Sequence, residues 1–184
     1  SDGVDLNLFY AKDIQRFNNV ESRNLVLGWV GNSNWGADTG QDVKGVRTIL
    51  KPAIEQLQAE GIPIVGDFLD RQFTTTPHER MVDYYGRIDV LVCVSSIEGT
   101  PNPVLEAMAC GVPIISTDVG IVPEALGPHQ ADFLLQNRSI PALKVAIRRL
   151  VRNPELLSVL SCENLDRARA WTWKSQAEKF ATFF

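Results

Sequence analysis

Short apolar runs alternate with longer stretches of helical periodicity along almost the whole chain. The runs at 25–30, 89–94 and 112–116 are nearly continuous in apolar residues and show no polar–apolar alternation. Such strands suit a parallel sheet that helices cover on both faces, because alternation is typical of a strand with one face in water. The pattern therefore predicts βαβ units with right-handed crossovers, which is an α/β fold.

The same pattern places the individual elements. Strands are expected at 25–30, 62–65, 89–94, 112–116 and 132–135, and helices at 43–60, 77–85, 104–110, 122–126, 141–151 and 154–170. The 184 residues contain no internal repeat, so they predict a single domain over residues 1–184. The aromatic-rich segment 171–184 is expected to dock on a surface outside this sequence. The chain starts at Ser1 without an initiator methionine, so we expect a piece of a longer protein.

Charge and composition exclude several classes of function. The net charge of −4, without a cluster of Lys and Arg, argues against a nucleic-acid partner. Three cysteines without paired spacing and two isolated histidines give neither a disulfide framework nor a metal site. No apolar run approaches the ~18 residues that a membrane span needs. We therefore expect a cytoplasmic protein.

Glu106 is the only charged residue between positions 99 and 117. A carboxylate is costly to bury unless hydrogen-bond donors satisfy it, and this segment contains neither Lys nor Arg. A ligand that donates hydroxyl groups would supply the missing donors. The alternative is an acid that complements a helix dipole, a contribution of roughly 0.3–1 kcal/mol.

The loop at 95–102 follows the predicted strand 89–94 and leads into this segment. In open α/β sheets, ligands bind beyond the carboxyl ends of the strands. Asn102 is a suitable N-cap and Pro103 suits the first helical position, so free N–H groups of the helix should face the crevice. A helix N-terminus of this kind favours phosphate. A second acid, Glu98, lies in the loop itself.

Segment 98–117 reads Glu-Gly-Thr-Pro-Asn-Pro-Val-Leu-Glu-Ala-Met-Ala-Cys-Gly-Val-Pro-Ile-Ile-Ser-Thr. It resembles the signature of retaining glycosyltransferases of the GT-B fold, the glycogen-synthase-like family 4. The resemblance extends over most of the chain, through Gly3-Val4-Asp5 with Phe9, Gly28–Gly31, Lys44-Gly45 and Gly120-Ile121-Val122-Pro123-Glu124. It implies the C-terminal half of a GT-B fold, a Rossmann-like three-layer domain with a parallel sheet flanked by helices.

The resemblance also implies roles for single residues. Glu106 would accept hydrogen bonds from the ribose hydroxyls of a sugar nucleotide, and Glu98 would lie beside the transferred sugar. Lys44 would reach the diphosphate and stabilise charge on the leaving group. The implied catalytic residues are Glu98 and Lys44, and the implied donor-binding residues are Glu106, Gly99, Thr100, Asn102, Val104, Leu105, Gly31, Asn32 and Gly120.

The chain departs from the family pattern after its first strand. Asn32 stands where the family usually has an arginine, so another cation, Arg71 or Arg87, would have to meet the diphosphate. Trp35, in the long loop before Lys44, is either part of a distinct donor or acceptor site or a packing residue. Gly120 fits either a close approach of backbone to ligand or a simple turn.

The function implied by the resemblance is retaining transfer of a hexose-type sugar from a nucleoside-diphosphate donor. The acceptor would be held by an N-terminal domain absent from this chain, through which the parent enzyme would also reach an inner membrane surface. No metal or other cofactor is expected, and the chain alone should show negligible turnover. The alternatives are an epimerase-like enzyme acting on sugar nucleotides, or a non-catalytic module that binds a nucleotide or a partner. The donor base, the sugar, the acceptor and the oligomeric state stay open.

Overall fold

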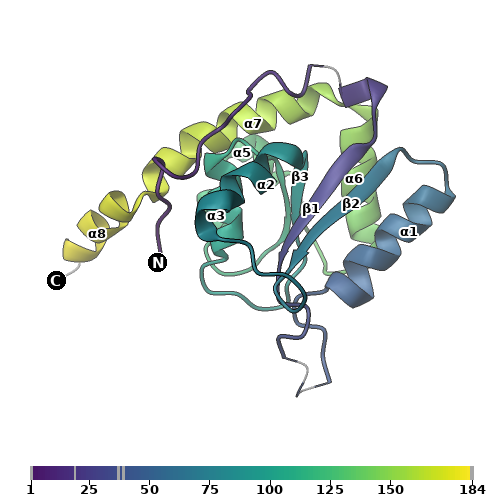
Figure 1. Cartoon of the computed structure of the whole chain (residues 1–184), viewed down its shortest axis with the longest axis horizontal. Coiled ribbons are helices and arrows are strands. Elements are labelled where there is room, and N and C mark those ends of the chain that lie inside the picture. Colours follow the sequence, from purple (N-terminus) through teal and green to yellow (C-terminus); the bar gives the residue numbers. More distant parts are fainter. Residues whose placement is uncertain (1, 19, 37, 39, 183–184) are drawn as a thin grey trace.

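A parallel β-sheet forms the centre of the molecule. The computed structural model describes residues 2–18, 20–36, 38 and 40–182. The strands of the sheet are β1 (Leu25–Gly31), β2 (Ile64–Asp70), β3 (Val90–Cys93), β4 (Ile114–Thr117) and β5 (Leu134–Leu135). They lie in the order β2-β1-β3-β4-β5, and every neighbouring pair is parallel (Figure 1). This confirms the predicted parallel α/β sheet.

Helices cover both faces of the sheet. The α-helices are α1 (Lys51–Ala59), α2 (Met81–Arg87), α3 (Asn102–Ala109), α4 (Val122–Ala125), α5 (Pro128–Ala131), α6 (Ile140–Arg152), α7 (Glu155–Ala168) and α8 (Trp173–Ala181). Short 3-10 helices are η1 (Val20–Ser22), η4 (His78–Arg80) and η5 (Arg169–Trp171), and the π-helix η3 (Val46–Leu50) leads directly into α1. Helices α1 and α6 contribute to one apolar cluster, and α2 and α3 contribute to the other. The three-layer arrangement expected from the sequence is therefore present (Figure 1).

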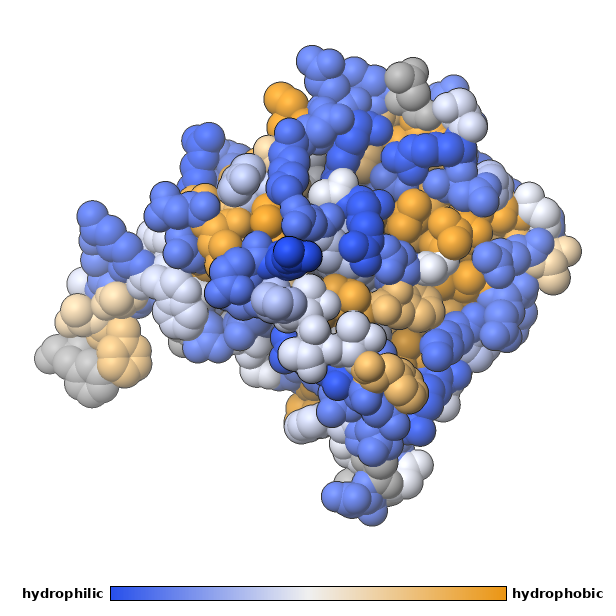
Figure 2. Space-filling model, viewed as in Figure 1, coloured by the Kyte–Doolittle hydropathy of each residue, from blue (hydrophilic) through white to orange (hydrophobic). Residues whose placement is uncertain are grey.

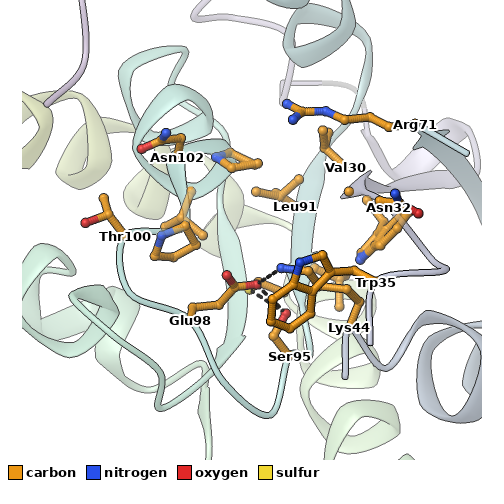
Figure 3. Close-up of a pocket in the computed structure, with 17 residues that line it drawn as sticks. Val30, Asn32, Trp35, Lys44, Arg71, Leu91, Ser95, Glu98, Thr100 and Asn102 are labelled. Atoms are coloured by element: carbon orange, nitrogen blue, oxygen red, sulfur yellow. Dashed lines mark hydrogen bonds and ion pairs between the residues drawn. The ribbon is translucent and has the colours of Figure 1, made fainter. Parts of the chain in front are cut away.

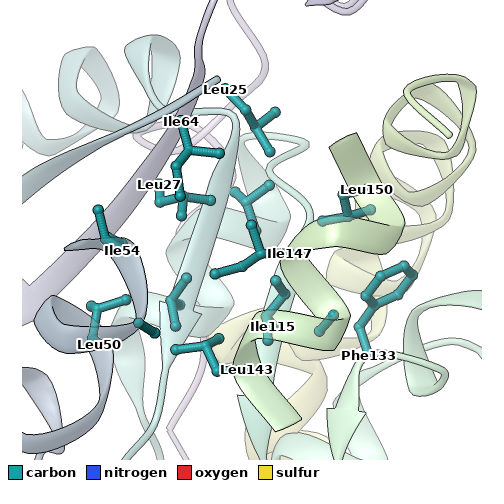
Figure 4. Close-up of a cluster of buried hydrophobic side chains, with 14 of the residues drawn as sticks. Leu25, Leu27, Leu50, Ile54, Ile64, Ile115, Phe133, Leu143, Ile147 and Leu150 are labelled. Atoms are coloured by element: carbon teal, nitrogen blue, oxygen red, sulfur yellow. The ribbon is translucent and has the colours of Figure 1, made fainter. Parts of the chain in front are cut away.

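The two apolar clusters explain why the central strands are apolar throughout. Val90 and Val92 of β3 point into the cluster under α1 and α6, which Figure 4 shows around Leu27, Leu143 and Ile147. The alternate residues of β3 point into the opposite cluster, which contains α2 and α3. Burying a side chain of this size stabilises the fold by about 1.5–3 kcal/mol. Because both faces of β3 are buried in this way, a polar side chain on this strand would be costly to the stability of the fold.

The join between β1 and β3 is short. Strand β1 pairs with β2 over its whole length, but it pairs with β3 only at Leu27–Val90 and Gly28–Leu91. The last three residues of β1 therefore run beside β2 alone. As a result, β1 and β3 separate at their carboxyl ends, between the β2-β1 pair and the β3-β4-β5 group.

Several predicted boundaries are wrong. Strand β2 continues five residues past the expected end, because it is an edge strand whose partly exposed positions tolerate Gly66, Asp67 and Asp70. The helix expected from position 43 begins later, at Val46. The Asp42 carboxylate accepts hydrogen bonds from the backbone N–H groups of Gly45 and Arg47, which follow it in the chain. Residues 42–45 therefore form a turn before the helix. Helices α5 and α8 are not expected from the sequence.

The C-terminal segment divides between the core and the surface. Trp171 is buried in the cluster formed by α2 and α3, whereas Trp173 and Phe180 on α8 are exposed. Helix α8 projects from the body of the molecule (Figure 1), and Figure 2 shows hydrophobic residues on it, while hydrophilic residues cover most of this face. Residues 183–184 of the segment expected to dock elsewhere lie outside the described residues. No helix among the described residues is both long and apolar enough to cross a bilayer.

Candidate functional site

A cavity of about 250 Å³ opens where β1 and β3 separate. Gly31 and Asn32 at the end of β1 form one wall, and Ser95 and Glu98 after β3 form another. The first turn of α3 closes a third side (Figure 3). The cavity therefore lies beyond the carboxyl ends of the central strands, where the strand order reverses, as expected for an α/β sheet.

Lys44 and Glu98 form an ion pair inside this cavity. The ammonium of Lys44 lies 2.5 Å from Oε1 of Glu98, and the Ser95 hydroxyl donates a hydrogen bond of 2.7 Å to the same oxygen. The Lys44 and Glu98 side chains are only 19% and 17% exposed. The structure thus brings together the two residues to which the family resemblance assigns catalytic roles, although they lie 54 positions apart.

The turn that carries Lys44 is fixed from two sides. The Asp42 carboxylate accepts hydrogen bonds from the N–H groups of Gly45 and Thr48, at 3.0 and 2.7 Å. The Arg138 guanidinium donates to the carbonyl of Val94 at 2.8 Å and to the carbonyl of Asp42. Sequence reasoning missed Arg138, because nothing in its local sequence indicates a contact with residues so distant along the chain.

Gly45 allows this turn to lie against the end of β3. Its φ angle is +71°, and a Cβ atom at this position would come within 2.4 Å of the Val94 carbonyl oxygen. A side chain is therefore excluded both by backbone conformation and by contact. This close approach brings Lys44 next to the loop that carries Glu98.

Trp35 and Arg71 also border the cavity. The Trp35 ring lies 5.0 Å from the Lys44 ammonium, and the residue is 52% exposed at the rim (Figure 3). Arg71 lines the cavity, and among the described residues no carboxylate pairs with it. Arg87 instead pairs with Asp67 at 2.6 Å, away from the cavity. Of the two arginines left open by the sequence, the structure places Arg71 at the site.

Glu106 has protein partners, which corrects the expectation that a ligand would supply its hydrogen-bond donors. The hydroxyl of Tyr85 donates to its Oε2 at 2.6 Å, and Nε2 of His78 lies 3.2 Å from its Oε1. Burial and the neighbouring Glu106 carboxylate raise the pKa of Tyr85 well above its usual value, so the phenol stays protonated as a donor. Glu106 itself is only 9% exposed.

Replacing Tyr85 with phenylalanine should destabilise the fold. The change leaves the buried Glu106 carboxylate with His78 as its remaining partner, and a lost hydrogen bond to a buried charge costs about 1–3 kcal/mol. Urea unfolding of Tyr85→Phe measures the loss. Tyr10→Phe, at a half-exposed tyrosine, is the matched control and should leave the free energy of unfolding unchanged. Equal stability of the two variants would contradict the importance of this hydrogen bond.

A second cavity, of about 260 Å³, lies beside the first. Val30 and Arg71 line both cavities. The second one is also bordered by the polar segment 74–76 and by His78, whose ring contacts Glu106. The site is therefore a pair of adjoining cavities, with Arg71 at their junction and Glu106 behind His78.

The other residues named from the sequence divide between the cavity and its supports. Gly31, Asn32, Thr100, Asn102 and Val104 line the first cavity, whereas Glu106, Gly99, Leu105 and Gly120 do not. Leu105 is buried in the apolar cluster of α2 and α3. Gly120 supports the Glu98 loop, because its neighbour Ile121 donates a backbone hydrogen bond of 3.1 Å to the Gly99 carbonyl.

The N-terminus of α3 differs from the sequence expectation. The helix begins at Asn102 itself, so Pro101 occupies the N-cap position and no side chain caps the helix. The N–H of Val104 already donates to the carbonyl of Pro101 at 2.8 Å. The helix therefore presents fewer free N–H groups to the cavity than predicted, and the side chains of Lys44 and Arg71 supply the positive charge there.

The chemistry of this site is that of anion and hydroxyl recognition. Two cationic side chains, one carboxylate and the amides of Asn32 and Asn102 line the first cavity. In the part of the chain that the structure describes, no three or more His, Cys, Asp or Glu side chains are grouped to hold a metal ion. A ligand with phosphate groups and hydroxyl groups would match these donors and acceptors.

Known proteins share this architecture. A glycosyltransferase described as "Putative teichuronic acid biosynthesis glycosyltransferase TuaC" from Bacillus subtilis (strain 168) is 42% identical over 110 residues, which is 54% of this chain and 28% of that protein. Sucrose-phosphate synthase from Thermosynechococcus elongatus matches 99% of this chain and 50% of its own, with a TM-score of 0.74 and 23% identity. Anabaena HepE, solved in complex with UDP and glucose, matches 98% of this chain and 55% of its own, with a TM-score of 0.64 and 18% identity.

These matches define the family and the fold. The chain spans about half the length of the two matched structures, and the matched segment is less than a third of the Bacillus subtilis protein. The structural likenesses show that the fold is that of a GT-B glycosyltransferase domain. Residues 71–165, just over half of the chain, match the family described as glycosyl transferases group 1. The chain therefore belongs to the glycosyl transferases group 1 family.

Proposed function

We propose that the two cavities bind a nucleoside-diphosphate sugar and that the chain is the donor-binding part of a retaining glycosyltransferase. The observation that carries the proposal is the placement of Lys44, Arg71 and Glu98 around one cavity at the carboxyl edge of the sheet. Two cations suit a diphosphate, and a carboxylate beside them suits the hydroxyls of a sugar. The HepE structure, which contains UDP and glucose, supports the choice of ligand class.

In this proposal each part of the donor occupies its own region of the two adjoining cavities. The diphosphate lies between Lys44 and Arg71, at the junction, and the sugar lies beside Glu98 in the first cavity. The nucleoside occupies the second cavity, and its ribose hydroxyls reach Glu106 by replacing His78, which separates Glu106 from that cavity in the free protein. Lys44 then stabilises the charge that develops on the diphosphate as the bond to the sugar breaks.

The acceptor and its binding domain belong to the part of the parent protein outside this sequence. The matched proteins are about twice as long as this chain or longer, which supports a two-domain parent enzyme. We infer that the transfer needs no metal ion, because the cationic side chains of Lys44 and Arg71 neutralise the diphosphate. We also infer, from the resemblance to retaining glycosyltransferases, that the transfer retains the anomeric configuration. The anomeric configuration of the product, measured by NMR with the parent enzyme in the presence of EDTA, tests both points.

Thermal unfolding of the chain with UDP, GDP, ADP and dTDP tests donor binding directly. A nucleotide at about 100 times its dissociation constant stabilises the folded state by roughly 2.7 kcal/mol. We expect an increase in Tm with one of these nucleotides, with or without Mg²⁺, and a much smaller increase in Glu106→Ala. Glu55→Ala, an exposed acid on α1, is the matched control and should respond like the wild type. No increase with any of the nucleotides would contradict the proposed donor site.

A further inference from the structure

One of the two cations of the donor site, Lys44, is already paired in the free protein. The Lys44 ammonium contacts the Glu98 carboxylate at 2.5 Å, and both side chains are more than four-fifths buried. The Trp35 ring lies on the same ammonium, 5.0 Å away. In Figure 3 the side chains of Lys44, Glu98 and Trp35 lie close together. An anion that binds Lys44 therefore competes with Glu98 for it.

A bare nucleoside diphosphate and a sugar nucleotide meet this competition differently. When a diphosphate binds Lys44, the Glu98 carboxylate gives up much of its contact with Lys44 and faces a second anion, although the Glu98 side chain is only 17% exposed. Like charges in such a place repel strongly. A sugar attached to the diphosphate brings hydroxyl groups that donate hydrogen bonds to Glu98 and so replace Lys44. A bare diphosphate brings none.

We propose that Glu98 makes the site select sugar-bearing nucleotides over the bare nucleoside diphosphate, by competing for Lys44. This inference rests on the proposed donor site. Glu98 then has a role separate from the chemistry of transfer: it weakens binding of the product left after the sugar has gone. The return of Lys44 to Glu98 accompanies release of that product, a step that limits turnover in many enzymes.

Ser95 provides a test in the opposite direction. Its hydroxyl donates a hydrogen bond of 2.7 Å to the oxygen of Glu98 that also contacts Lys44. This bond remains when Lys44 turns to a ligand, so it stabilises the carboxylate in the bound state. Removing the hydroxyl should make Glu98 depend more on Lys44. Bare diphosphate should then bind more weakly in Ser95→Ala, whereas it should bind more tightly in Glu98→Gln.

The experiment measures dissociation constants by isothermal titration calorimetry for UDP and UDP-glucose, GDP and GDP-mannose, and ADP and ADP-glucose. The pair that the wild type binds is then measured with Glu98→Gln and Ser95→Ala. We expect Glu98→Gln to bind the bare diphosphate about three- to tenfold more tightly, and the preference for the sugar nucleotide to fall about tenfold. We expect Ser95→Ala to bind the bare diphosphate about threefold more weakly.

Each outcome decides between the selection by Glu98 and simpler explanations. If Glu98→Gln strengthens both ligands equally, Glu98 only repels anions, and the inference is wrong. Weaker binding of the bare diphosphate in both variants would mean that the carboxylate and the hydroxyl merely support the site, which also overturns it. If the wild type binds a nucleotide but shows no preference for its sugar form, the inference alone fails. If the wild type binds none of the six ligands, the proposed function fails as well.

Discussion

Lys44→Gln is expected to weaken binding of the nucleoside diphosphate about 30- to 100-fold. The change removes the charge-assisted contact that we propose between Lys44 and the diphosphate, and such contacts are about twice as strong as neutral hydrogen bonds. It also removes the positive charge that balances the Glu98 carboxylate, so the incoming anion meets an unbalanced negative charge. Isothermal titration calorimetry with the nucleotide that stabilises the wild type measures the effect.

Lys174→Gln is the matched control for this prediction. Lys174 lies on the exposed face of α8 and its side chain is 86% exposed, so its replacement removes the same charge far from the cavity. The affinity of the Lys174→Gln variant for the nucleotide should equal that of the wild type. If Lys44→Gln binds the nucleotide as well as this control does, Lys44 does not contact the diphosphate, and the assignment of the first cavity as the diphosphate site fails.

Gly120→Ala is expected to lower the free energy of unfolding by about 2–4 kcal/mol. Gly120 has a φ angle of +52°, and a Cβ atom at this position would lie 1.9 Å from the carbonyl oxygen of Gly99. The left-handed conformation alone costs a residue with a side chain about 1–2 kcal/mol, and the contact with backbone adds the cost of shifting the Glu98 loop. Urea unfolding measures the change.

Gly61→Ala separates the two costs. Gly61, at the end of α1, also has a positive φ angle, +78°, but a Cβ atom there would meet no other atom within 4 Å, so only the backbone conformation opposes alanine. The expected loss is about 1 kcal/mol. Equal losses in the two variants would mean that the Gly99 loop moves freely, and that Gly120 does not fix the loop behind Glu98.

Much of the fold could be predicted because the strongest constraints are local. The apolar runs that form β3 and β4 are buried on both faces, so their composition alone reveals them. The edge strand β2 is different: its partly exposed positions carry Gly66 and Asp67, which removes the apolar signal from its second half. The sequence pattern therefore ends this strand too early.

That boundary error has a consequence for the site. Arg71 directly follows the last residue of β2, at the carboxyl edge of the sheet where ligands bind, and its N–H donates to the Gly31 carbonyl at 2.7 Å. If the strand ended at position 65, Arg71 would be no better placed than Arg87. The difference between the two arginines depends on sheet register, which a single sequence does not contain.

The partners of the two glutamates show the same limit. The roles of Lys44 and Glu98 are implied by a family resemblance, and the geometry of the pair depends on Asp42 and Arg138, which local patterns do not connect. The Tyr85 partner of Glu106 lies on another helix, and a search for basic residues near Glu106 in the sequence could not find it. Sequence reasoning therefore identified the side chains that line the site better than the residues that position those side chains.

The short join between β1 and β3 has a consequence for the mechanics of the domain. The β2-β1 pair is linked to the rest of the sheet by pairing at Leu27–Val90 and Gly28–Leu91. The β1–β3 edge therefore has fewer backbone hydrogen bonds than the β1–β2 edge. The cavity lies where β1 and β3 separate, with Gly31 on one side and Ser95 on the other. A ligand that contacts both sides would link the two parts of the sheet. Part of its binding energy would then oppose local separation of β1 from β3 and so stabilise the domain against partial unfolding.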